Sequence, residues 1–125
     1  MLNAIHHVAI LVSDYEKSRD FYVNKLGFAV VRENHRPDKG DIKLDLALGD
    51  AELEIFWAPK APVRPTRPEA LGLRHLAFRV ESVEKAKAWL EGMGILCEPV
   101  RIDEFSAKPF TFFFDPDGLP LELHE

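Results

Sequence analysis

The sequence predicts an α+β fold built from two βαβββ modules in tandem, and two observations support it. The same order of predicted elements occurs twice, over about residues 4–57 and again over about 73–125. Between them, the segment of about 58–72 carries four prolines, which fix φ and remove backbone donors, so we expect a semi-extended connector. A chain of 125 residues suffices for one compact domain, and we expect both modules to form a single domain over residues 1–125.

The first module is predicted to begin with an apolar strand at about residues 4–12. Ser13 or Asp14 can cap the helix that follows, and Gly27 suits the position just after its last turn. Three more strands are expected at about 28–34, 42–48 and 51–57, and the turn Gly49-Asp50 joins the last two as a hairpin.

The second module repeats this order from a strand at about residues 73–80. Ser82 is expected to cap its helix and Gly94 to end it. One side of this helix is predicted to carry Val83, Ala86, Trp89, Leu90 and Met93. Strands follow at about 95–102, 109–114 and 119–124, the last two joined by an Asp-Pro-Asp-Gly turn.

The two modules can be superimposed by a shift of 68 residues along the chain. This shift aligns His7 with His75 and Glu54 with Glu122, so that each histidine precedes its glutamate by 47 residues. The coincidence of strand, cap, helix and carboxylate positions indicates an internal repeat, which is the strongest signal in the sequence.

Strand alternation assigns these four residues to one face of each sheet. Val8, Ile10 and Val12 form the apolar face of the first strand, which leaves His7 on the opposite face and predicts that His6 packs. The same reasoning places His75 opposite the core, and Glu54 and Glu122 alternate with apolar residues on the last strands. A single histidine or glutamate at such a position is commonly structural, but four at matched positions favour a binding site.

Two imidazoles and two carboxylates form a mixed donor set that suits a divalent metal such as Zn²⁺, Ni²⁺, Co²⁺, Mn²⁺ or Fe²⁺. The two carboxylates would balance the charge of the ion. Four protein ligands on an ion that accepts six leave two positions for water or a bidentate substrate. The two sheets could meet within one chain or across two chains, and the sequence leaves this open.

Four segments resemble a known superfamily: HHVAILVSDYEKSRDFYVNKLGF, AELEIF, GLRHLAFRV and FFDPDGLPLELHE. The chain is similar to the vicinal-oxygen-chelate superfamily and, within it, to small bacterial glyoxalase I-like proteins, a group that also includes bleomycin-resistance proteins and dioxygenases. The resemblance implies paired βαβββ modules that form a cupped, mostly antiparallel sheet around a metal, usually in a homodimer. The metal ligands of the family fall on His7, Glu54, His75 and Glu122.

This complete ligand set implies glyoxalase I chemistry, that of a lactoylglutathione lyase-like metalloenzyme with Zn²⁺ or Ni²⁺ as the first choices of metal. The expected substrate is a small α-hydroxycarbonyl or hemithioacetal that reacts through a chelated enediolate, with Glu122 as the proton-shuttling base and Glu54 as its counterpart. Arg79, on the face of His75, is expected to bind an anionic group of the substrate, with a surface salt bridge as the alternative. The alternative functions are a non-haem metal dioxygenase and a drug-sequestering protein without catalysis.

The chain departs from the family pattern at two positions where glutathione would bind. Bacterial glyoxalase I usually has arginine four residues after the first ligand, where this chain has Leu11. It usually has asparagine four residues after the first glutamate ligand, where this chain has Ala58. These changes leave the identity of the thiol carrier open.

Composition restricts the remaining classes of function. A net charge of −5 and scattered Lys and Arg disfavour nucleic acid as a partner. No apolar run approaches the roughly 20 residues that span a bilayer, and the N-terminus lacks the pattern of a signal peptide. Cys97 is the only cysteine, which suits a reducing compartment. We therefore expect a cytoplasmic protein that acts on a small molecule, without nucleic acid or membrane as a partner.

Overall fold

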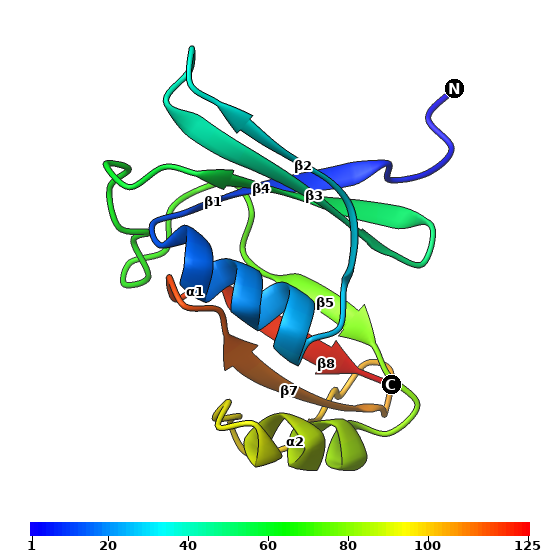
Figure 1. Cartoon of the computed structure of the whole chain (residues 1–125). Helices are drawn as coiled ribbons and strands as arrows, with labels where there is room; N and C mark the ends of the chain where they lie inside the picture. The colour runs from blue at the N-terminus through cyan, green and yellow to red at the C-terminus, as the bar shows by residue number, and fades with distance from the viewer. The chain divides into compact units, whose positions relative to one another are not determined.

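Each half of the chain folds into its own four-stranded mixed sheet, shown in Figure 1 from blue to green and from green to red. The computed structural model describes residues 1–125, which divide into two units, Met1–Pro62 and Val63–Glu125. No helix in the structure has the length and apolar character needed to cross a bilayer.

The first unit contains β1 (His7–Val12), α1 (Tyr15–Arg19), the π-helical segment η1 (Asp20–Lys25), β2 (Ala29–Arg36), β3 (Asp41–Leu48) and β4 (Ala51–Trp57). Of the two possible caps, Asp14 is the one observed, because its Oδ1 accepts a hydrogen bond of 3.0 Å from the backbone N–H of Lys17. The prediction that β1 starts at residue 4 is wrong, since regular pairing begins at His7.

The helix of the first unit ends in a wider turn than the sequence predicted. The backbone N–H of Leu26 donates to the carbonyl of Phe21 at 2.9 Å, five residues earlier. Phe21 and Tyr22, although adjacent in sequence, are both buried. Gly27 follows with a φ of 81°, which a residue without Cβ adopts at little cost and which ends the helix.

The second unit contains β5 (Leu76–Arg79), α2 (Val83–Gly92), β6 (Arg101–Ile102), β7 (Pro109–Phe114) and β8 (Pro120–His124). The Oγ of Ser82 accepts from the backbone N–H of Lys85 at 3.2 Å and caps α2 as expected. The turn before β8 also forms as expected, since Oδ1 of Asp115 accepts from the backbone N–H groups of Asp117 and Leu119, each at 2.9 Å.

Two strands of the second unit are shorter than predicted. The strand expected at 73–80 is limited to Leu76–Arg79, so that His75 stands just before it. The strand expected at 95–102 is limited to Arg101–Ile102, although the backbone N–H of Glu98 still donates to Phe112 at 2.9 Å. Pro99 interrupts this stretch because it has no N–H to donate to a ladder.

Helix α2 packs against β7 and β8 through a narrower apolar stripe than expected. Val83 and Leu90 are fully buried, which confirms the helical spacing of this face. Trp89 was predicted to share that face, but 52% of it is exposed. Adjacent residues of an α-helix are rotated by about 100° around its axis. Leu90 lies at the centre of the apolar stripe, so Trp89 lies at its edge.

The two sheets have the same topology. Their strand orders are β1-β4-β3-β2 and β5-β8-β7-β6. In each sheet the first strand of the module pairs in parallel with the last, and the other pairings are antiparallel. The α+β fold class and the repeated order of elements are thus confirmed.

The register of the parallel pair is also repeated, and this register positions the site. In the first sheet Ala9 on β1 is opposite Glu54 on β4. In the second sheet Ala77 on β5 is opposite Glu122 on β8. Each alanine lies two residues after a histidine, and side chains two apart share a face. The histidine and the glutamate of each module therefore project from the same face of their sheet.

Candidate metal centre

The first module brings His7 and Glu54 together. His7 opens β1, and Glu54 lies near the middle of β4, between the buried Leu53 and Ile55. The Nε2 atom of His7 is 3.6 Å from Oε1 of Glu54. The imidazole is about half exposed, and the carboxylate is mostly buried. The alternation of apolar residues along β4 thus holds Glu54 on the face opposite the core.

The second module brings His75 and Glu122 together in the same way. The Nε2 atom of His75 is 3.1 Å from Oε2 of Glu122, between the buried Leu121 and Leu123 on β8. The edge of the His75 ring meets the ring of Phe112, with centroids 5.1 Å apart and planes at 84°. This contact fixes the orientation of the imidazole beside the carboxylate.

The donor atoms of each pair fit a divalent metal. An imidazole nitrogen faces a carboxylate oxygen, and these are the ligand types that Zn²⁺ and Ni²⁺ accept. Neither unit by itself gathers three or more His, Cys, Asp or Glu side chains that could hold a metal ion. Each unit thus brings together one histidine and one glutamate of the four residues that the sequence predicts as ligands.

The prediction that His6 packs is wrong. Its side chain is 80% exposed, although its backbone carbonyl accepts a hydrogen bond of 2.9 Å from the backbone N–H of Glu52 on β4. Its Nδ1 lies 2.9 Å from Nδ1 of His7, a hydrogen bond in which one ring donates and the other accepts. His6 thus contacts the edge of its neighbour instead of the core.

A charged cluster beside Glu54 was missed by the sequence reasoning. Asp45 on β3 is directly opposite Glu54 and is fully buried. Arg32 Nε lies 2.6 Å from Oδ2 of Asp45, and Lys43 Nζ lies 2.9 Å from its Oδ1. The Lys43 ammonium is also 3.5 Å from Oε2 of Glu54. The hydrogen bond to Asp45 raises the pKa of Lys43 above its usual value, and the charges of Asp45 and Glu54 act in the same direction.

The corresponding positions of the second module are aromatic. Phe112 is opposite Glu122, as Asp45 is opposite Glu54. Phe110 is opposite His124, as Lys43 is opposite Phe56. The two glutamates therefore have different surroundings, although their strands and registers are the same.

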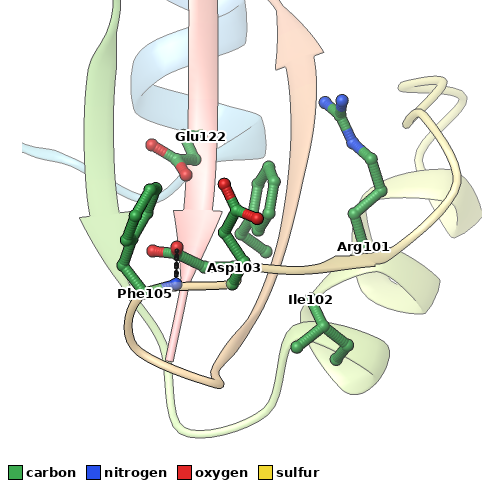
Figure 2. Close-up of a pocket in the computed structure, with 7 residues that line it drawn as sticks. Arg101, Ile102, Asp103, Phe105 and Glu122 are labelled. Atoms are coloured by element: carbon green, nitrogen blue, oxygen red, sulfur yellow. Dashed lines mark hydrogen bonds between the residues drawn. The ribbon is translucent and has the colours of Figure 1, made fainter.

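A cavity of about 390 Å³ opens beside Glu122 in the second unit (Figure 2). It is lined by Arg101, Ile102, Asp103, Glu104, Phe105, Phe110 and Glu122. The guanidinium of Arg101 lies over the Phe110 ring, 4.9 Å from its centroid. Arg79 is exposed at the end of β5, opposite His124, and is not among these lining residues.

The loop that forms one wall of this cavity is organised by Asp103. Its Oδ1 accepts from the backbone N–H of Phe105 at 2.9 Å, the dashed bond in Figure 2, and its Oδ2 accepts from the Ser106 hydroxyl at 3.0 Å. These hydrogen bonds, the backbone one first, lower the pKa of the Asp103 carboxyl. These hydrogen bonds hold the turn that contains Glu104 and Phe105, and both residues line the cavity.

The two positions that depart from the glutathione-binding pattern carry no polar side chain. Leu11 is 61% exposed on β1. Ala58 follows β4, and its backbone N–H donates to the carbonyl of Val12 at 2.8 Å. Neither side chain can donate a hydrogen bond to a carboxylate.

Similarity to known proteins identifies the family of the chain. Residues 4–123 match the Glyoxalase/Bleomycin resistance protein/Dioxygenase superfamily, and the chain belongs to this superfamily. It is 57% identical over 126 residues to Uncharacterized protein YwkD of Bacillus subtilis (strain 168), a match that covers 100% of this chain and 98% of that one.

Two further relatives extend the comparison. A crystal structure of the glyoxalase family protein from Enterococcus faecalis is 64% identical, with a TM-score of 0.94, and the match covers 98% of this chain and 97% of that one. Glyoxylase I 4 of Arabidopsis thaliana is 28% identical over 126 residues, which cover 98% of this chain and 70% of that protein.

Replacing Asp45 by alanine should destabilise the first unit strongly. The substitution would leave two cations without the buried carboxylate that they share, and breaking a buried ion pair from one side costs about 3–5 kcal/mol of unfolding free energy. Urea unfolding followed by circular dichroism measures this cost. The matched control is Asp41→Ala, which removes the partner of Arg36 at a solvent-accessible position and should cost much less. Equal losses in the two variants would contradict the importance of the buried cluster.

Proposed function

We propose that the protein is a metal-dependent, glyoxalase I-like lyase or isomerase that acts on a small α-hydroxycarbonyl or hemithioacetal. The observation that carries this proposal is the His–Glu pair that occurs in both modules at the same register. A repeated pair of this kind supplies two nitrogen and two oxygen donors. Membership of a superfamily that includes glyoxalases supports the same conclusion.

In this proposal the side chains of His7, Glu54, His75 and Glu122 would hold the metal ion. The mixed donor set favours Zn²⁺ or Ni²⁺, with Co²⁺, Mn²⁺ and Fe²⁺ as alternatives. When bound, such an ion acts as a Lewis acid that polarises a substrate carbonyl and acidifies the neighbouring C–H group. Side chains of the protein would transfer the proton and bind the substrate.

We assign the proton transfer to Glu122. Its carboxylate lines the cavity and is therefore accessible to a bound substrate. It removes the proton from the carbon next to the carbonyl and returns it to the adjacent carbon. Glu54 is its counterpart in the first module, but one oxygen of Glu54 is already paired with Lys43 at 3.5 Å.

The cavity beside Glu122 is the proposed site for the rest of the substrate. Its aromatic side chains, Phe105 and Phe110, can contact an apolar group, and Arg101 supplies a cation at its edge. Arg79 is the other candidate for an anionic group of the substrate, because it lies on the face of His75. Leu11 and Ala58 cannot replace the missing arginine and asparagine, and each lost charged hydrogen bond would cost about 1.5–3 kcal/mol. We therefore propose a substrate whose carrier is not glutathione.

We further expect a homodimer in the cytoplasm, with a small-molecule substrate and no nucleic-acid partner. The homodimer follows from the resemblance to glyoxalase I-like proteins. Size-exclusion chromatography with light scattering would report the mass directly, which is twice 14.2 kDa for the proposed assembly.

The purified protein should contain about one divalent ion per chain, and both halves of the predicted ligand set should be needed to hold it. We expect His7→Ala, His75→Ala and Glu122→Ala each to lose the ion, since each removes one of four donors. Elemental analysis by mass spectrometry after dialysis gives the stoichiometry, and circular dichroism checks the fold. Arg79→Ala is the control that should retain the metal. A folded protein that binds no metal, or variants that bind as the wild type does, would contradict the site.

Glu122→Gln should lower the rate of metal-dependent hydrogen exchange at the α-carbon of the substrate by about 10²- to 10⁴-fold, because it removes the base. Deuterium incorporation from D₂O into a panel of α-hydroxycarbonyls and hemithioacetals, followed by NMR, measures this rate. Glu52→Gln is the matched control, since Glu52 lies two residues before Glu54 on the same face of β4.

Three outcomes would contradict the proposed chemistry. Exchange that persists in Glu122→Gln would exclude Glu122 as the base. Oxygen consumption with catechols, without exchange, would indicate a dioxygenase. Tight stoichiometric binding of a drug-like ligand without turnover would indicate a sequestering protein.

A further inference from the structure

We propose that Lys43 is a positioning residue that restrains Glu54 to one-oxygen metal binding and thereby makes the two glutamate ligands unequal. The ammonium of Lys43 holds Oε2 of Glu54, which leaves Oε1 for the metal ion. This inference rests on the proposed function, in which Glu54 and Glu122 are both metal ligands. It adds a residue outside the ligand set and assigns a separate role to each glutamate.

The contacts of Glu54 support this division of its two oxygens. Its Oε1 faces Nε2 of His7 at 3.6 Å, and its Oε2 faces Nζ of Lys43 at 3.5 Å. The carboxylate thus has the histidine ligand on one side and a cation on the other. The positive charge of the Lys43 ammonium beside Oε2 opposes the approach of a divalent ion to that oxygen, since like charges at short range repel.

Lys43 is held in place by contacts other than Glu54. Its Nζ lies 2.9 and 3.2 Å from the two oxygens of Asp45, and it also lies over the Phe56 ring, 5.8 Å from the centroid. Asp45 is fully buried, and a buried carboxylate needs cations to remain charged. Asp45 therefore keeps the ammonium beside Glu54, because moving the ammonium away would leave a buried carboxylate with one cation fewer.

Arg32 provides an internal comparison. Its Nε lies 2.6 Å from Oδ2 of Asp45, so it neutralises the same buried carboxylate as Lys43 does. Its second ion pair is with Glu52, at 3.8 Å, and not with Glu54. Arg32 and Lys43 thus share a structural role on Asp45, and Lys43 alone of the two pairs with the proposed ligand.

The second module lacks this arrangement at the equivalent positions. Phe110 and Phe112 stand where the first module has Lys43 and Asp45. No ammonium projects from these positions of β7 toward Glu122, which lines the cavity instead. With a metal bound, Glu54 would therefore be the glutamate held by a cation, and Glu122, which lines the cavity, would be the one placed to take a proton from a substrate.

The test compares metal affinity with thermal stability in Lys43→Met, Lys43→Arg and Arg32→Met. The Zn²⁺ dissociation constant is measured by competition with a chromophoric chelator, and the Co²⁺ absorption spectrum reports the coordination number. Lys43→Met should bind Zn²⁺ at least about tenfold more tightly, because a like charge is removed and Oε2 becomes available. The weaker Co²⁺ bands of a higher coordination number should accompany this change.

The melting temperature should fall in both methionine variants, since each removes a cation from the buried Asp45. Arg32→Met should nevertheless keep the metal affinity of the wild type within about threefold, because Arg32 does not pair with Glu54. Lys43→Arg should restore the wild-type affinity and spectrum. If Lys43→Met does not fold, Lys43→Gln can retain a hydrogen bond to Asp45 without the charge and gives the same readout.

A purely structural role for Lys43 predicts the opposite result. In that case Lys43→Met would lose stability, its affinity for Zn²⁺ would be no higher than that of Arg32→Met, and its Co²⁺ spectrum would be unchanged. This result would show that the inference is wrong. If the wild-type protein binds no metal, the proposed metal site itself fails. The two failures are therefore distinguishable.

Discussion

The parallel pairing between the first and last strands of each module determines where the polar side chains of the candidate site lie. It places Ala9 opposite Glu54 and Ala77 opposite Glu122, and each alanine shares a face with the histidine two residues earlier. A slip of one residue in either pairing would move the glutamate to the apolar face of its sheet. The buried residues on both sides of each glutamate oppose such a slip, so hydrophobic packing fixes the positions of the polar donors.

The repeat gives each module a His–Glu pair, and the residues around the two pairs differ. The first module surrounds its glutamate with the buried Asp45 and the cations of Lys43 and Arg32. The second surrounds its glutamate with aromatic rings and a cavity. A carboxylate paired with a cation suits a fixed ligand, whereas a carboxylate at a cavity suits proton transfer to a substrate. The proposed roles of the two glutamates therefore differ because their surroundings differ.

Sequence patterns predicted the order of elements along the chain, and alternation along each strand predicted that the histidine and the glutamate of a module share one face of the sheet. The order of the strands within each sheet came from the structure. Sequence reasoning failed for His6, since nothing in a run of apolar letters shows where strand pairing begins. It also missed Lys43 and Asp45. Their alternation with leucines along β3 places them on the face of the site, but their proximity to Glu54 depends on the register between β3 and β4, which the sequence does not state.

The proposed metal site requires both His–Glu pairs to bind the same ion. A crystal structure of the Zn²⁺-loaded protein, with anomalous diffraction at the zinc edge, tests this requirement. We expect a single peak within about 2.0–2.2 Å of Nε2 of His7, Nε2 of His75 and one oxygen each of Glu54 and Glu122, whether these come from one chain or two. A peak bound by one pair alone, or by other residues, would contradict the proposed site.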